Sequence, residues 1–181
     1  MATGINKALE HAIKSVSGAA VLKIVHFTSV HPRYDVRIFW KQCRTLAEAG
    51  FDITLVVADG KGDETKDGVK IVDAGRRQGG RVSRMVLAAR KVVSVALALD
   101  ADVYHFHDPE LLPHSAKLIR AGKKVIFDSH EDFVADIQSK SYINKHLRSL
   151  VSVLYSAYER IAVKRINHVV AATPAIRMKF E

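Results

Sequence analysis

The strongest constraint on the fold is a regular alternation of short apolar segments with longer segments of helical periodicity. Apolar, β-branched runs cover residues 21–27, 51–57, 69–72, 102–107, 123–127 and 168–172. Apolar residues recur at helical spacing over 36–49, 82–97, 109–121 and 144–165, and another helix begins at Pro174. Buried parallel strands alternating with helices have this pattern. The sequence therefore predicts an α/β fold, a doubly wound parallel sheet with helices on both faces.

Length and composition predict one domain. The chain has 181 residues, of which 48% are hydrophobic and 26% charged, enough for one well-buried core and too apolar for a disordered polymer. The longest run without charged residues, 166–176, is too short to cross a bilayer, which needs about 20 apolar residues. A lone cysteine, Cys43, allows no intrachain disulfide and fits a reducing cytoplasm.

The first twenty residues stand apart from this pattern. Ile5, Leu9, Ile13 and Val16 recur at helical spacing, which indicates an amphipathic segment rather than a signal peptide. Two interpretations stay open: an accessory surface helix, or a segment that does not belong to the native chain. The predicted domain therefore covers residues 21–181.

Positive charge is concentrated in two stretches. The net charge is +9, and the segments 74–99 and 140–165 each carry six basic residues against at most one acidic residue. Such stretches favour an anionic partner, either lipid headgroups, a phosphorylated substrate or nucleic acid, although solvated helix faces would also account for them. No nucleic-acid-binding motif accompanies the charge, so nucleic acid is not expected.

Ligands of doubly wound sheets bind beyond the carboxyl ends of the strands, so the residues there are the first candidates. The loop after the first strand lacks the Gly-X-Gly-X-X-Gly that dinucleotide binding requires, which disfavours NAD and FAD. It carries His31, Arg33 and Arg37 instead, a set that suits a phosphate or a hydroxylated ligand. A simple proline turn with solvated arginines is the alternative.

Two further strand ends carry imidazoles and carboxylates. Alternation places His105 and His107 on one face of their strand, and Asp108 and Glu110 read as the N-cap and first turn of the next helix. A pair of histidines beside a carboxylate favours a functional role.

The next apolar run ends in the same way, with His130 and Glu131. The prediction there is acid–base or hydroxyl-binding use of His130, with Glu131 as a substrate-binding residue.

Two other kinds of enzyme use residues of these types. Imidazole and carboxylate ligands also suit zinc, manganese or iron, so a metal-dependent hydrolase is an alternative; its candidate ligands are His105, His107, Asp108, Glu110, His130, Glu131 and Asp132. No Gly-X-Ser-X-Gly elbow is present, and Cys43 falls on the buried face of its helix, so serine and cysteine hydrolase chemistry is not expected.

Four segments, each at a strand end and in the same order, resemble the N-terminal half of glycosyltransferase family 4. They are residues 25–39 (VHFTSVHPRYDVRIF), 105–112 (HFHDPELL), 128–132 (DSHED) and 169–174 (VVAATP). The resemblance runs from about Val21 to Glu181 and is greatest with transferases of bacterial surface polysaccharides. It implies a GT-B architecture of two Rossmann-like domains, of which this chain would be the N-terminal, acceptor-binding lobe.

The family implies retaining transfer of a sugar from a nucleotide-sugar to an acceptor hydroxyl, with no metal or other cofactor. Carried over by position, His130 matches a histidine that contacts the donor sugar, and His107, Asp108 and Glu110 match a loop where acceptor contacts are expected. The first loop departs from the family pattern, because His31-Pro32-Arg33 stands where many members have paired glycines. Donor-phosphate contact therefore does not carry over to Arg33 or Arg37.

The leading hypothesis is one lobe of a hexosyltransferase. The C-terminal nucleotide-sugar domain is absent from this sequence, so the chain alone is expected to be inactive. The acceptor is expected to be a lipid-linked saccharide, with the enzyme in the cytoplasm, peripheral to the inner face of the cytoplasmic membrane and attracted to anionic lipid by the basic stretches. The alternative is a non-catalytic Rossmann-like module that binds a phosphorylated or glycosylated ligand.

Overall fold

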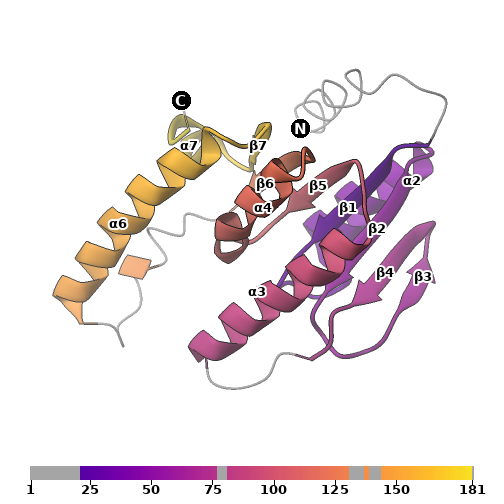
Figure 1. The fold of residues 1–181 in the computed structure, drawn as a ribbon, viewed down its shortest axis with the longest axis horizontal. Coiled ribbons are helices and arrows are strands. Elements are labelled where there is room, and N and C mark those ends of the chain that lie inside the picture. Colours follow the sequence, from indigo (N-terminus) through magenta and orange to yellow (C-terminus); the bar gives the residue numbers. More distant parts are fainter. Residues whose placement is uncertain (1–20, 77–80, 131–136, 139–143, 181) are drawn as a thin grey trace.

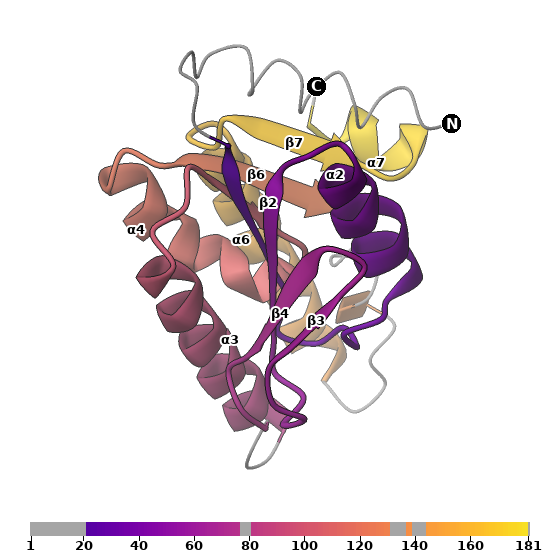
Figure 2. The same cartoon turned by 90° about the vertical axis from the view of Figure 1, so that its right-hand side faces the viewer.

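The computed structural model describes residues 21–76, 81–130, 137–138 and 144–180. The predicted N-terminal segment 1–20 and the candidate residues Glu131 and Asp132 lie outside the described residues. The described part forms one sheet with helices packed on both faces (Figures 1 and 2). The predicted Rossmann-like α/β fold is therefore confirmed.

The sheet has seven strands in the order β3-β4-β2-β1-β5-β6-β7. Their bounds are β1 Lys23–Phe27, β2 Asp52–Val57, β3 Glu64–Lys66, β4 Val69–Asp73, β5 Val103–Phe106, β6 Lys124–Ser129 and β7 His168–Ala171. All neighbouring pairs are parallel except β3 with β4. The six predicted strands are present, and β3 is an additional short strand at the edge of the sheet.

The predicted helices are present, two of them with irregular first turns. The segment 36–49 forms a π-helix, η1 Val36–Cys43, followed by α2 Arg44–Glu48, and the segment 109–121 forms a 3₁₀-helix, η2 Pro109–His114, followed by α4 Ser115–Arg120. The other helices are α3 Arg81–Ala98, α6 Lys145–Val163 and α7 Pro174–Met178. Asp35 is the N-cap of η1, because its Oδ1 accepts hydrogen bonds from the Arg37 and Ile38 amides.

The two faces of the sheet have separate cores. Along β1, Ile24 packs with Ile38, Phe39 and Cys43 under η1, whereas Val25 faces the other layer, with the buried residues of α3 and α4. Figure 2 shows η1 and α2 on one side of the sheet and α3 and α4 on the other. Because side chains alternate along a strand, His26 shares the η1 face with Ile24.

Helix α6 presents its apolar side to solvent. Leu150, Val153 and Ile161 are 56%, 67% and 59% exposed, and Leu147 and Leu154 on the same stripe are also exposed. The side that packs against the protein carries Ser152 and Glu159, both buried, with Glu159 bound by Lys179 at 2.7 Å. The apolar stripe read from the sequence is therefore not part of the core. No helix within the described residues is both long and apolar enough to cross a membrane.

Candidate functional site

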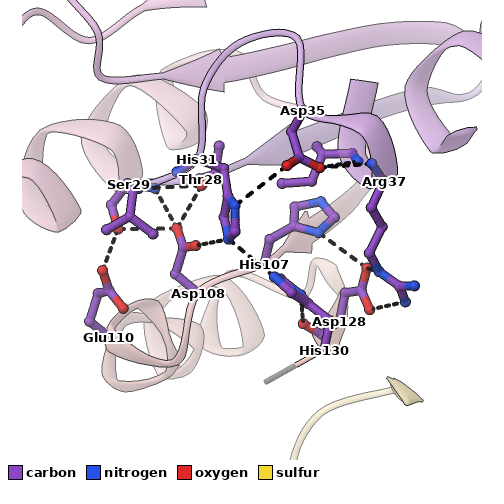
Figure 3. A network of polar contacts seen from close by, with 12 residues as sticks. Thr28, Ser29, His31, Asp35, Arg37, His107, Asp108, Glu110, Asp128 and His130 are labelled. Atoms are coloured by element: carbon purple, nitrogen blue, oxygen red, sulfur yellow. Dashed lines mark hydrogen bonds and ion pairs between the residues drawn. The ribbon is translucent and has the colours of Figure 1, made fainter. Parts of the chain in front are cut away.

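Polar side chains gather where β1, β5 and β6 end, at the carboxyl edge of the sheet (Figure 3). These strands are adjacent and parallel, so their carboxyl ends lie together. The loop after β1 brings His31, the end of β5 brings His107 and Asp108, and the end of β6 brings Asp128 and His130. The strand ends selected from the sequence thus form one cluster.

Asp108 ties the end of β5 to the loop after β1. Its Oδ2 accepts hydrogen bonds from the Thr28 hydroxyl, at 2.8 Å, and from the Ser29 amide, and its Oδ1 lies 3.2 Å from His31 Nε2. The side chain makes no cap hydrogen bond to η2, although the residue occupies the N-cap position. The predicted N-cap position of Asp108 is therefore confirmed, but its buried side chain holds the loop after β1 and does not bond the helix amides.

Asp128 is bonded through both of its carboxylate oxygens. Arg37 donates to both of its oxygens, at 2.6 and 3.0 Å, and Gln42 Nε2 donates to Oδ2 at 2.7 Å. His107 Nδ1 lies 3.3 Å from the same oxygen. Burial opposes ionisation, but the hydrogen bonds from His107 and Arg37 outweigh it and lower the pKa of Asp128 well below its usual range.

Three histidines lie together beneath this carboxylate. His26 on β1 is in register with His105 on β5, and the His105 and His107 rings stack at 4.7 Å. His26 Nδ1 lies 3.1 Å from His107 Nε2, and both nitrogens of His105 lack a hydrogen-bond partner. Burial lowers the pKa of His26 well below its usual value and that of His105 to about 3, so these two rings are neutral near neutral pH.

His130 and His31 meet at the more open side of the cluster. Their Nε2 atoms are 3.1 Å apart, and His130 Nδ1 lies 3.3 Å from the Asp128 carbonyl oxygen. Both rings keep partial exposure to solvent. Burial lowers the pKa of His130, against the opposing effect of the Asp128 charge. A neutral imidazole at this position can donate a hydrogen bond to a ligand hydroxyl through its N–H, or accept one from it through its other nitrogen.

Glu110 lies at the other end of the network, on η2. Ser29 Oγ donates to its Oε1 at 2.9 Å. Burial, and then the charge of Asp108, raise the pKa of Glu110. The neighbouring carboxylates Asp108 and Glu110 thus have pKa values shifted in opposite directions, which is typical of sites that move protons or bind polar ligands.

Of the two candidate arginines, only Arg37 contacts the cluster. Arg37 belongs to the cluster through Asp128. Arg33 instead contacts Asp59 and Glu64, and its Nη2 donates to the Gly62 carbonyl at 3.0 Å. It is nearly buried, and its contacts with these two carboxylates hold the loop after β1 against β3 and the loop that precedes it. The proline-turn interpretation with solvated arginines is therefore wrong for Arg33.

Several members of the network were not among the sequence candidates. Thr28, Ser29 and Gln42 carry no distinctive local signal, and their role depends on contacts across more than 75 residues of chain. Asp128 could have been found, because it stands at a strand end beside His130. His26 could also have been found, since it falls on the same face as its cross-strand neighbour His105.

Two groups of described residues have the composition of a metal site. One is His26 with His105 and His107, and the other is His107 with Asp128 and His130, each with ligand atoms within 4.8 Å of one another. In the second group, Arg37 and Gln42 already bind the oxygens of Asp128. The first group offers imidazole ligands only, which suit a borderline transition metal.

Solved structures share this fold. Sucrose-phosphate synthase from Thermosynechococcus elongatus superposes with a TM-score of 0.60 over 87% of this chain, at 14% identity. A trehalose-6-phosphate structure from E. coli bound with UDP-2-fluoro glucose superposes with a TM-score of 0.52 over 87% of this chain, at 11% identity. The matches cover 44% and 41% of those chains, so this chain spans less than half of their length. They confirm one Rossmann-like lobe of the GT-B architecture.

Sequence comparison gives the family. No curated protein matches the chain. The family model of Glycosyltransferase Family 4 matches residues 36–181, which include η1, the carboxyl ends of β5 and β6, and β7. Because this match covers most of the chain, the protein belongs to Glycosyltransferase Family 4.

Proposed function

We propose that this chain is the acceptor-binding N-terminal domain of a retaining glycosyltransferase that moves a sugar from a nucleotide-sugar to a lipid-linked saccharide in surface-polysaccharide synthesis. The observation that carries the proposal is the convergence of His31, His107, Asp108, Asp128 and His130 at the carboxyl ends of three adjacent strands. Ligands of doubly wound sheets bind at this edge. The nucleotide-sugar would be held mainly by a second domain.

His130 is the proposed catalytic residue of this domain. Its ring is partly exposed and neutral near neutral pH, so it can hydrogen-bond a hydroxyl of the donor sugar. The electron-rich nitrogen of a neutral imidazole would also stabilise positive charge that develops on the sugar as the diphosphate departs. Glu110, whose pKa is raised by burial, is the proposed contact for acceptor hydroxyls.

The lipid-linked acceptor is proposed from the surface of the domain. Helix α6 exposes Leu150, Val153 and Leu154, and two exposed basic residues, Lys164 and Arg165, directly follow its end. An apolar helix face beside basic side chains is typical of helices that lie on anionic membranes. Such a surface would bring the site to a lipid-linked saccharide at the membrane, and the proposed location is its cytoplasmic face.

The test is sugar transfer by the protein that contains this domain. A panel of radiolabelled nucleotide-sugars is supplied with lipid-linked saccharides extracted from bacterial membranes, and both the labelled lipid product and its anomeric configuration are measured. The expected result is acceptor-dependent labelling with the anomeric configuration of the donor retained. An inverted product contradicts the retaining mechanism, and labelling of water-soluble saccharides alone contradicts the lipid-linked acceptor.

A further inference from the structure

Hydrogen-bond roles at His130 can be assigned from its two neighbours. Nδ1 lies 3.3 Å from the Asp128 carbonyl oxygen, and Nε2 lies 3.1 Å from His31 Nε2 (Figure 3). A carbonyl oxygen only accepts, so Nδ1 must carry the hydrogen of the first contact. A neutral ring has one N–H, and therefore His130 Nε2 carries a lone pair.

The same reasoning extends to His31. Since His130 Nε2 accepts, the hydrogen of that contact must be on His31 Nε2. Asp108 Oδ1 also lies 3.2 Å from His31 Nε2, and a carboxylate oxygen is an acceptor. One N–H is thus shared between a carboxylate oxygen and the His130 ring, and both contacts require a hydrogen on His31 Nε2. On the other side of the ring, His31 Nδ1 lies 3.7 Å from Asp35 Oδ2, which is longer than a normal hydrogen bond.

Asp108 is fixed well enough to impose this arrangement. Its side chain is fully buried, and its Oδ2 accepts from the Thr28 hydroxyl and the Ser29 amide. These bonds hold the carboxylate plane, so Oδ1 stays directed at His31. Burial raises the pKa of Asp108, but the contact with His31 and then the Ser29 amide and the Thr28 hydroxyl lower it below its usual value.

We propose that Asp108 and His31 are a positioning pair that fixes His130 as its Nδ1–H tautomer, with the Nε2 lone pair directed at the place of a substrate hydroxyl. The inference rests on the proposed function, because it assigns a task to His130 in sugar transfer. A hydroxyl that binds here replaces the His31 N–H and donates its own hydrogen to His130 Nε2. His130 then acts as an acceptor, and His31 and Asp108 act through it.

Ring nitrogen NMR of the 181-residue chain tests the pair directly. In a long-range ¹⁵N–¹H spectrum at about pH 7.5, His130 is expected to show a protonated Nδ1 and an unprotonated Nε2. His31→Gln retains an N–H donor and should keep this state, whereas His31→Leu has no donor and should raise the fraction of Nε2–H tautomer roughly fivefold, the effect of one lost hydrogen bond. His114→Gln, a histidine on η2 outside the network, is the matched control.

Two spectra would overturn the proposal: an Nε2–H tautomer of His130 in the unmodified chain, or an unchanged tautomer in His31→Leu. If His31→Leu fails to fold, the proposal is tested by the other two spectra: both the unmodified chain and His31→Gln should show His130 with a protonated Nδ1 and an unprotonated Nε2. In the transferase that contains this domain, His31→Leu should lower kcat more than it raises KM, and His31→Gln should lose less. If the spectra agree with the prediction but the protein transfers no sugar, the proposed function is refuted and the assignment of the His31–Asp108 pair stands. If His31→Leu changes the tautomer of His130 but leaves kcat unaltered, the positioning role is refuted.

Discussion

The Arg37 guanidinium spans both carboxylate oxygens of Asp128, at 2.6 and 3.0 Å, and so joins η1 to the carboxyl end of β6. The two residues are 91 positions apart in the chain. Asp128 is fully buried, and Arg37 is 27% exposed. This pair fixes the helix that covers one face of the sheet relative to the strand that carries His130.

Removal of Arg37 should destabilise the domain. Arg37→Met leaves the buried Asp128 without its main counter-charge, and the expected loss of unfolding free energy is about 2–4 kcal/mol, at the lower end because Arg37 is partly exposed. Urea unfolding measures it. The matched control is Arg44→Met, whose pair with Glu48 lies on the surface and should change stability little. Equal effects of the two substitutions would contradict the structural role of Arg37.

The fold should begin to lose stability at pH values well above the pKa values of its carboxylates. His26 and His105 have pKa values lowered by burial, whereas the unfolded chain binds protons at these positions below about pH 6.5. The unfolded state therefore binds more protons, and stability is greatest above about pH 7 and falls as the pH decreases. Each of the two histidines should contribute a loss of about 2 kcal/mol between pH 6.5 and 5.

His105→Leu isolates one of these groups. The substitution removes a ring whose two nitrogens lack hydrogen-bond partners. It should reduce the slope of unfolding free energy against pH by the amount that corresponds to about one proton bound on unfolding. Urea midpoints at pH 7.5 and 5.5 give the comparison. A dependence as steep as that of the unmodified chain would show that His105 is protonated in the folded state.

Metal analysis separates the transferase from the metal-dependent hydrolase that the same residues permit. Arg37 and Gln42 bind the oxygens of Asp128, so we expect purified protein to hold less than about one metal ion per ten chains after dialysis. Elemental mass spectrometry measures the content, and dialysis against zinc followed by buffer tests affinity. Stoichiometric, tightly held metal would favour the hydrolase.

The exposed face of α6 should bind anionic vesicles. Leu150→Gln and Leu154→Gln each remove a side chain that would enter the bilayer, and each should weaken binding to phosphatidylglycerol vesicles about tenfold, from the transfer energy of a leucine side chain. Val21→Gln, at a residue 62% exposed outside α6, is the control. Sedimentation with vesicles measures binding, which should also weaken with salt. Equal binding by all variants would contradict a lipid-facing role.

Features set by local periodicity were predictable from the sequence, and features set by contacts between distant residues were not. The parallel strands and their helices follow from apolar spacing. β3 was missed because Glu64–Lys66 is a short polar edge strand that pairs through its backbone. The Asp108 side chain was assigned to a cap because its partners, Thr28 and Ser29, are about 80 residues away. The exposed face of α6 was not foreseen, because periodicity shows that a helix has an apolar side but not where that side points.

The transfer rate of a His130→Ala variant tests the central claim most directly. The measurement is made in the protein that contains this domain, with the donor and acceptor that the transfer assay identifies, and with His114→Ala as a control outside the network. Loss of a residue that hydrogen-bonds the reacting sugar should lower kcat by roughly 10²–10⁴-fold, with the folded structure retained. A kcat near that of the unmodified enzyme would contradict the role of His130 and, with it, the assignment of this edge of the sheet as the active site.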